Sequence, residues 1–127
     1  VGSEMCIRDR FGSRLVVVMG HTRCGAVSAT VHAIETGMSS ESRNIRSITD
    51  RIAPHVASLV RTGSEGDVLR EATRANVRAS ADHLRHGSRI LEDLVLAGRL
   101  VIVCAEYELE TGEVHFFDGL PERFTPA

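Results

Sequence analysis

Short apolar runs divide the chain and predict its strands. Residues 14–19, RLVVVM, form a run rich in β-branched valine, too short and too apolar for an amphipathic helix. Residues 99–109, RLVIVCAEYEL, begin in the same way and then alternate, and 113–118, EVHFFD, return after a tight turn at 110–113. Runs that are apolar on both faces are typical of parallel strands buried on both sides. We therefore expect 14–19 to be such a strand.

The first two predicted helices follow from apolar residues at helical spacing. One begins at Gly25 and stops at Gly37, and the next occupies 43–60, where Pro54 is expected to break or kink it. The positions expected on their apolar sides are Val27, Thr30, Val31 and Ile34, then Ile45, Ile48, Ile52, Val56 and Leu59.

Two further helices are predicted before the second strand. Asp67 caps a helix that continues to about His86, and Ser88 caps a short one that Gly98 closes. Their apolar positions are Val68, Ala72, Ala75, Ala79 and Leu84, then Ile90, Leu91, Leu94 and Val95. The order of strand, helices, strand and hairpin predicts an α/β domain with parallel strands and an antiparallel edge.

Composition narrows the class of protein. The 127 residues suffice for one domain, and 43% hydrophobic with 25% charged residues is the balance of a soluble chain. A net charge of −2 gives no electrostatic footprint for nucleic acid or an anionic membrane. The longest apolar run is far below the ~20 residues of a membrane span. No secretory signal precedes the first strand, so we expect a cytoplasmic protein.

His21 and Cys24 are the chemically distinctive pair. They follow the first strand at once, in GHTRCG, where open α/β sheets place their ligands. Zinc favours thiolate and imidazole ligands, so the pair is a candidate metal site. The spacing alone leaves the alternative open, since buried cysteine is often a small hydrophobe. Cys6, Cys24 and Cys104 are an odd count without an export signal, which argues against a disulfide framework.

Other polar residues have simpler interpretations. Cys104 lies in mid-strand and is expected to pack in the core, and His115 is expected to face solvent. Glu106 and Tyr107 are candidates for lining an interface. Surface or solvated roles are expected for the remaining helical residues of interest: His32, His55, His83 and His86, and the arginines Arg74, Arg78 and Arg85.

Two stretches carry a resemblance to a known family. VVVMGHTRCGAV, residues 16–27, resembles the zinc-binding strand-to-helix segment of the β-class carbonic anhydrases, and 75–118 is similar to that family's C-terminal part, including a Tyr-x-Leu-x-Thr-Gly hairpin. The resemblance covers 14–118. It implies a partial β-carbonic-anhydrase-like fold, a central parallel sheet flanked by helices with an antiparallel C-terminal edge strand. It also implies that strands 14–19 and 99–107 are adjacent.

The resemblance implies a function as well. The family hydrates CO2 reversibly to bicarbonate on Zn2+ held by two cysteines and one histidine, and His21 and Cys24 match two of these ligands. The backbone N–H of Gly25, at the helix start, is then a candidate contact for the substrate or for the aspartate of the family's Cys-x-Asp-x-Arg segment. Family members are homodimers or larger assemblies, so we expect an oligomer. The first ligand belongs to a Cys-x-Asp-x-Arg segment, whose aspartate and arginine orient the fourth zinc position.

The segment CIRDR, residues 6–10, does not supply that motif. It has Arg8 where the aspartate belongs, and it lies only fourteen residues before Gly20, too close for a crossover between parallel strands. EMCIRDR looks instead like translated sequencing adapter. We therefore expect a non-native prefix at 1–13, a truncated domain at 14–118 and a tail at 119–127.

With the catalytic Asp–Arg pair absent, the resemblance implies a chain that is inactive by itself. Two alternatives remain open. One is the same zinc chemistry on another small heterocumulene such as carbon disulfide, and the other is a non-catalytic assembly or regulatory module.

Overall fold

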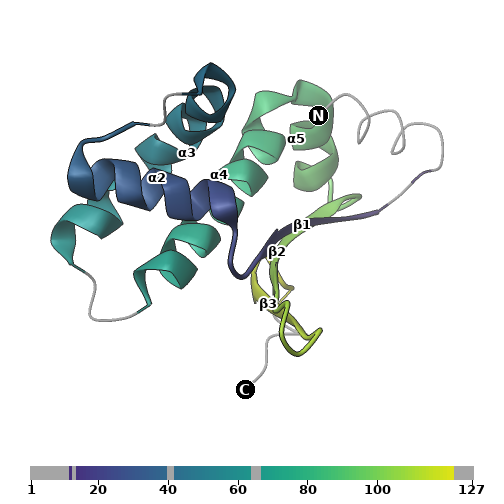
Figure 1. Ribbon diagram of the computed structural model, residues 1–127. Helices are drawn as coiled ribbons and strands as arrows, with labels where there is room; N and C mark the ends of the chain where they lie inside the picture. Colours follow the sequence, from purple (N-terminus) through teal and green to yellow (C-terminus); the bar gives the residue numbers. More distant parts are fainter. Residues whose placement is uncertain (1–11, 13, 40–41, 64–66, 122–127) are drawn as a thin grey trace.

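The computed structural model describes residues 12, 14–39, 42–63 and 67–121. Most of the expected prefix 1–13, with Cys6 and the segment 6–10, lies outside these residues, as does the end of the expected tail 119–127. The elements follow one another as β1 (Leu15–His21), α2 (Gly25–Thr36), α3 (Arg43–Thr62), α4 (Val68–Gly87), α5 (Arg89–Leu96), β2 (Val101–Tyr107) and β3 (Val114–Asp118) (Figure 1).

The three strands form one mixed sheet in the order β1-β2-β3. β1 and β2 are parallel and in register from Leu15 opposite Val101 to His21 opposite Tyr107, and β3 is antiparallel to β2. The adjacent parallel pair and the antiparallel edge strand predicted from the sequence are thus confirmed. The register places the carboxyl end of β1 beside the start of the β2–β3 hairpin.

Helix α4 is the centre of the fold. It packs against β1 and β2 and also against α2, α3 and α5, with the other helices arranged around it (Figure 1). One core cluster joins α4 and α5 to the sheet, and a second joins α2, α3 and α4. The first contains Val77, Ala81, Leu91, Leu100, Ile102 and Cys104, and the second contains Val27, Val31, Ile52, Val56 and Ala72.

Gly20 allows the close approach of β1 to α4. A Cβ atom built on Gly20 would lie 2.6 Å from Val77 Cγ2 and 3.0 Å from Thr73 Cγ2, so a side chain there would collide with the helix. The strand extends past the predicted run 14–19 and through this glycine, because β1 continues to His21. This position therefore serves packing, and the strand carries His21 on its last residue.

The expectation that β1 is buried on both sides is wrong for the described part of the chain. Its residues alternate, because α4 covers one face of the sheet while the other face of β1 remains open. Neighbouring β2 is buried through its five central residues. The large apolar side chains exposed on β1 and β3 are Leu15 (57%), Val17 (37%), Met19 (50%), Val114 (38%) and Phe116 (46%).

Helix α3 passes through Pro54 without a break, contrary to one of the two outcomes predicted there. Pro54 is exposed, so the carbonyl of Asp50, which it leaves without a helical donor, can bond to water. The predicted apolar stripe is only partly buried, since Ile52 and Val56 are in the core while Ile45 and Ile48 are 42% and 47% exposed.

The buried face of α4 also differs from the predicted one, since it is turned toward the sheet as well as toward α2 and α3. Its capping by Asp67 is confirmed, because the carboxylate accepts a 3.2 Å hydrogen bond from Arg70 N–H. The buried residues of α4 are Ala72, Thr73, Val77 and Ala81.

Across the described residues, no helix combines the length and apolar character that crossing a membrane requires.

Candidate metal centre

The loop from β1 to α2 carries the predicted metal ligands. His21 is the last residue of β1, and Cys24 is the N-cap of α2. Between them Arg23 has a φ of 55°, a left-handed conformation that few non-glycine residues adopt. This sharp reversal lets the chain pass from strand to helix in three residues, and such backbone outliers are frequent at functional sites.

The ring of His21 is oriented by its own backbone neighbourhood. The side chain is exposed, and Nδ1 lies 2.9 Å from the carbonyl oxygen of Thr22. A carbonyl only accepts, so this hydrogen bond requires Nδ1 to carry the proton and leaves Nε2 as the nitrogen with a lone pair. A metal-binding histidine commonly has its other nitrogen fixed in this way.

Cys24 presents a free thiol at the start of α2. It is half-buried and belongs to no disulfide, and its carbonyl accepts the first helical bond, 2.9 Å from Ser28 N. Gly25 follows with open space around it, because no atom lies within 4 Å of the position that a Cβ would occupy. The first N–H groups of a helix have no intrahelical partner and favour an anion nearby.

The β2–β3 hairpin fastens this loop. Thr22 N–H donates to the carbonyl of Tyr107 at 3.0 Å, the N–H of Leu109 donates to the Thr22 hydroxyl at 3.0 Å, and Arg23 pairs with Glu110. These contacts hold the loop between His21 and Cys24 against the turn of the β2–β3 hairpin.

Inside the hairpin, the hydroxyl of Thr111 donates to Glu108 at 2.8 Å, and this bond, with the neighbouring His115, lowers the pKa of the Glu108 carboxyl. Glu108 therefore stays ionised to lower pH than an ordinary glutamate. Both backbone and side-chain hydrogen bonds stabilise the turn.

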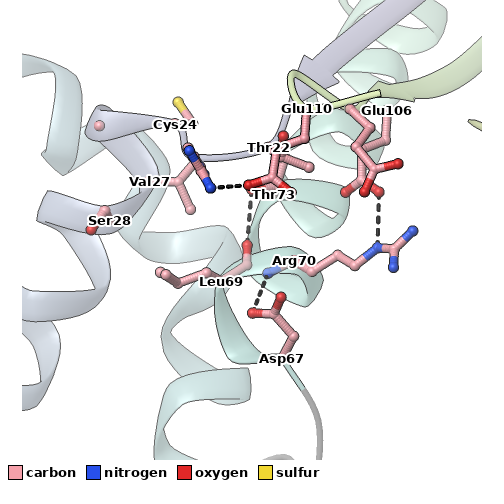
Figure 2. Close-up of a pocket in the computed structure, with 13 residues that line it drawn as sticks. Thr22, Cys24, Val27, Ser28, Asp67, Leu69, Arg70, Thr73, Glu106 and Glu110 are labelled. Carbon is pink, nitrogen blue, oxygen red and sulfur yellow. Dashed lines mark hydrogen bonds and ion pairs between the residues drawn. The ribbon is translucent and has the colours of Figure 1, made fainter. Parts of the chain in front are cut away.

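A cavity of about 500 Å³ opens beside Cys24, with Glu106 and Arg70 turned toward one another on its far side (Figure 2). Glu106 is 1% exposed, and its Oε1 accepts from Arg70 Nε at 2.9 Å and from Arg74 Nη2 at 3.2 Å. The prediction that Glu106 lines an interface is therefore wrong. Its second oxygen, Oε2, has no hydrogen-bond partner among the described residues.

The predicted solvated arginine face on α4 is also wrong. Arg74 and Arg78 lie over the ring of Phe117, at 5.1 and 5.0 Å from its centroid, and Arg85 donates to the carbonyl of Ile102 at 2.9 Å. Their apolar stems cover the sheet while the guanidinium groups find acceptors. The alternation of β3 puts Phe117 on the helix side, which is the one sequence signal for this contact.

The other candidate residues lie apart from the loop. Cys104 is fully buried in the core as predicted, and burial, with the nearby Asp118 charge, raises the pKa of its thiol. His115 keeps 39% of its side chain exposed, in line with its predicted solvent-facing role, and also lies 3.5–3.6 Å from the carboxylates of two glutamates. The four helical histidines are exposed as expected: His32, His55, His83 and His86.

The donor set suits zinc in kind, since an oriented imidazole and a free thiol stand three residues apart. Their convergence on one ion stays a prediction. Among residues 14–39, 42–63 and 67–121, no third histidine, cysteine or carboxylate joins His21 and Cys24 in a cluster of ligand atoms. Catalytic zinc normally has three protein ligands, so His21 and Cys24 alone would not complete such a site.

Comparison with known proteins identifies the family. Residues 8–114 match the carbonic anhydrase family model. The chain is 32% identical over 106 residues to carbonic anhydrase 2 of Mycobacterium tuberculosis, covering 84% of this chain and 50% of that protein. It is 31% identical over 102 residues to the carbonic anhydrase of Mycolicibacterium smegmatis, covering 79% and 47%. The chain thus spans about half the length of these curated relatives.

Solved structures agree on the fold. The β-carbonic anhydrase CcaA superposes with a TM-score of 0.69 at 21% identity, over 93% of this chain and 53% of that one. The β-carbonic anhydrase CafD of Aspergillus fumigatus gives 0.65 at 18% identity, over 92% and 64%. The fold and the loop define an α/β protein with zinc-type ligands at a strand end. The chain belongs to the carbonic anhydrase family, and it shares the fold of the β-class members.

Proposed function

We propose that His21 and Cys24 are two of the three protein ligands of a zinc site that hydrates CO2 to bicarbonate, and that this chain does not turn over CO2 by itself. The observation that carries the proposal is the pairing of an oriented imidazole with a free thiol at the carboxyl end of β1, in a chain of this family. Zinc supplies an acidified water as nucleophile at neutral pH.

The residues of the loop have distinct roles in this proposal. Thr22 holds the His21 ring through its carbonyl, so that Nε2 is the ligand atom. Cys24 supplies a thiolate at the start of α2, where the helix favours negative charge. The N–H of Gly25 contacts CO2 or the bicarbonate formed from it, and the open space at its Cα leaves the backbone approachable.

The proposed inactivity rests on the described residues, which bring no third ligand atom to His21 and Cys24. Two ligands hold zinc more weakly than three. A base or gate that orients the nucleophile is also needed, and the buried carboxylate of Glu106 is engaged by two arginines. An incomplete ligand set is also compatible with an alternative function, a non-catalytic assembly or regulatory module. A Cys-x-Asp-x-Arg segment upstream in the parent gene would favour the enzyme, and its replacement there would favour the module.

We further propose that the protein assembles as a homodimer or larger oligomer. The open face of the sheet presents five large apolar side chains on β1 and β3. Within the described part of the chain, β1 pairs with β2 alone, so its other edge has free backbone groups. Exposed apolar faces and open strand edges favour association, and light scattering that finds a stable monomer would contradict it.

Stopped-flow CO2 hydration with stoichiometric zinc tests the proposed activity. We expect no turnover above the free-metal control for the 127-residue chain and for its Cys24→Ala and Cys6→Ala variants. Robust turnover that both substitutions abolish would make Cys6 the third ligand and overturn the proposed inactivity. Parallel assays with carbon disulfide distinguish the second heterocumulene, and turnover of that substrate alone would replace CO2 in the proposal.

A further inference from the structure

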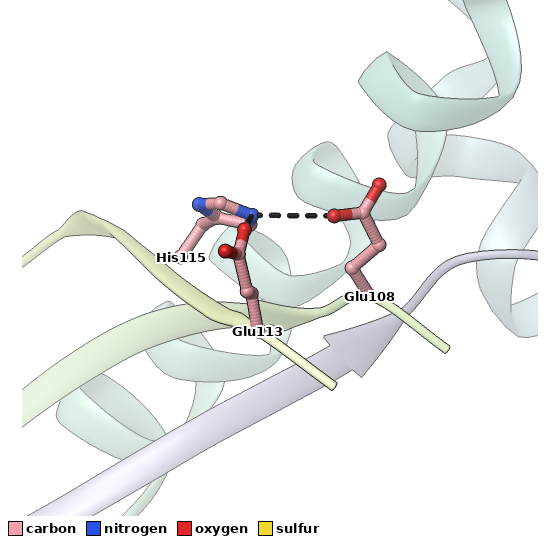
Figure 3. A group of neighbouring side chains, drawn as sticks. All are labelled: Glu108, Glu113 and His115. Carbon is pink, nitrogen blue, oxygen red and sulfur yellow. Dashed lines mark ion pairs between the residues drawn. The ribbon is translucent and has the colours of Figure 1, made fainter. Parts of the chain in front are cut away.

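A second group of ligand-type side chains lies on the β2–β3 hairpin, on residues distinct from His21 and Cys24. Glu108, Glu113 and His115 each offer a ligand atom, and these atoms all lie within 4.8 Å of one another. The Nε2 atom of His115 is 3.6 Å from Glu108 Oε2 and 3.5 Å from Glu113 Oε2 (Figure 3). One imidazole nitrogen therefore faces one carboxylate oxygen from each of the two glutamates.

The two nitrogen–oxygen separations are compatible with ligands of one small metal ion. Zinc binds imidazole nitrogen at ~2.0–2.1 Å and carboxylate oxygen at ~2.0–2.2 Å in tetrahedral geometry. Neighbouring vertices of such a tetrahedron are about 3.3–3.6 Å apart. The two nitrogen–oxygen distances on the hairpin fall at the upper end of that range, so His115 can share an ion with either glutamate with little movement of the side chains.

The backbone of the hairpin holds the three residues in place. The N–H of Glu108 donates to the carbonyl of Glu113 at 2.8 Å, and the N–H of Gly112 donates to the carbonyl of Glu108 at 2.8 Å. Gly112 has a φ of 76°, which closes the turn. Ordering the ligands before the ion arrives lowers the entropic cost of binding.

The chemistry of the donors selects the class of ion. An imidazole with two carboxylates suits zinc and its first-row neighbours, whereas Ca2+ and Mg2+ prefer oxygen ligands alone. The three side chains are 33%, 39% and 66% exposed, for Glu108, His115 and Glu113, so water has access to further positions on the ion.

We propose that Glu108, Glu113 and His115 form a second site for a divalent transition-metal ion such as Zn2+, separate from the site of His21 and Cys24. Without a bound ion, the imidazolium form of His115 can pair with the two glutamates, and this ion pair is the competing explanation of the cluster. The two explanations predict different results when Zn2+ is added. A metal site binds the ion, whereas residues that form only an ion pair do not.

Isothermal titration with Zn2+ on the full chain in a Cys6→Ala/Cys24→Ala background isolates this site from thiolate ligation. We expect one equivalent to bind, with the affinity reduced at least about tenfold by His115→Ala and by Glu113→Gln. The matched controls are His32→Ala and Glu35→Gln, which alter an exposed histidine and an exposed glutamate on α2. These should bind as the parent does.

Equal Zn2+ affinity and stoichiometry in the hairpin and control variants would overturn the proposal, as would no binding in the parent. Circular dichroism verifies folding, and Glu108→Gln decides the outcome if His115→Ala fails to fold. The result is independent of CO2 hydration, because the background lacks the Cys24 thiol on which that activity depends.

Discussion

The N–H of Leu109 donates a 3.0 Å hydrogen bond to the hydroxyl of Thr22, across 87 residues of sequence. The bond ties the tip of the β2–β3 hairpin to the middle of the loop that carries His21 and Cys24. Through this bond the hairpin contacts the candidate metal centre, and its described residues add no ligand atom to a cluster with His21 and Cys24. We therefore expect the stability of the loop to depend on the hairpin.

Replacing Thr22 by valine tests this connection. Thr22→Val keeps the shape of the side chain and removes the acceptor of the Leu109 N–H, so we expect the free energy of unfolding to fall by about 0.5–1.5 kcal/mol. Denaturant unfolding measures the loss. The control is Thr62→Val, whose hydroxyl donates to carbonyls of its own helix, α3, at an exposed site and should change stability less. An equal loss in both variants would show that the loop is held by other contacts.

Close packing of β1 on α4 predicts a severe effect at Gly20. The Cβ of Gly20→Ala would meet Val77 Cγ2 at 2.6 Å, and Val77 is a core residue, so we expect about 1–3 kcal/mol of destabilisation. Val77→Ala should rescue part of that loss in the double variant. Gly25→Ala is the control, since open space surrounds its Cα, and thermal unfolding should show it near the parent. A Gly20→Ala protein as stable as the parent would contradict this account of the glycine.

The buried carboxylate of Glu106 should stabilise the sheet against α4. Glu106→Gln leaves two arginines with a weaker acceptor, so we expect a loss of about 1–3 kcal/mol, limited because both arginines reach solvent. Arg74→Ala should cost more than Arg70→Ala, because Arg74 also covers Phe117. Glu35→Gln, at an exposed site, is the control in denaturant unfolding. The reverse order of the two arginine variants would refute the proposed packing role.

Burial of Cys104 predicts a loss of stability at alkaline pH. Its pKa is raised in the folded protein, so its contribution is complete below the ordinary thiol pKa of about 8.5. As pH rises above that value the unfolded chain ionises first, and stability declines until the folded pKa is passed, by at most about 1.4 kcal/mol per pH unit. Urea unfolding from pH 7 to 10 should show this decline reduced in Cys104→Ala. An identical pH profile in the variant would contradict it.

Much of the fold was predictable because it depends on local patterns. Valine-rich runs, glycine stops and the Asp67 cap correctly predicted the order of strands and helices. The burial of β1 was not predictable, because exposure of Val17 and Met19 depends on which face of the sheet α4 covers. Pro54 fits an unbroken helix because it lies on the solvent side, which its own sequence neighbourhood does not reveal.

In the candidate site, too, the residues grouped in one sequence motif were predictable, whereas contacts between distant segments were not. The sequence pointed to His21, Cys24 and Gly25 because they are close together in one motif. The pairing of Glu106 with Arg70 and Arg74 was missed because the partners are 36 and 32 residues away and meet only when α4 packs on the sheet.

Zinc X-ray absorption on the metal-loaded chain tests the central claim most directly, in a His115→Ala background that removes the proposed hairpin site. We predict a sulfur shell at ~2.3 Å that Cys24→Ala diminishes and Cys104→Ala does not, with a nitrogen contribution at ~2.0–2.1 Å that His21→Ala reduces. A zinc environment that neither Cys24→Ala nor His21→Ala alters would contradict the assignment of these two residues as the ligands.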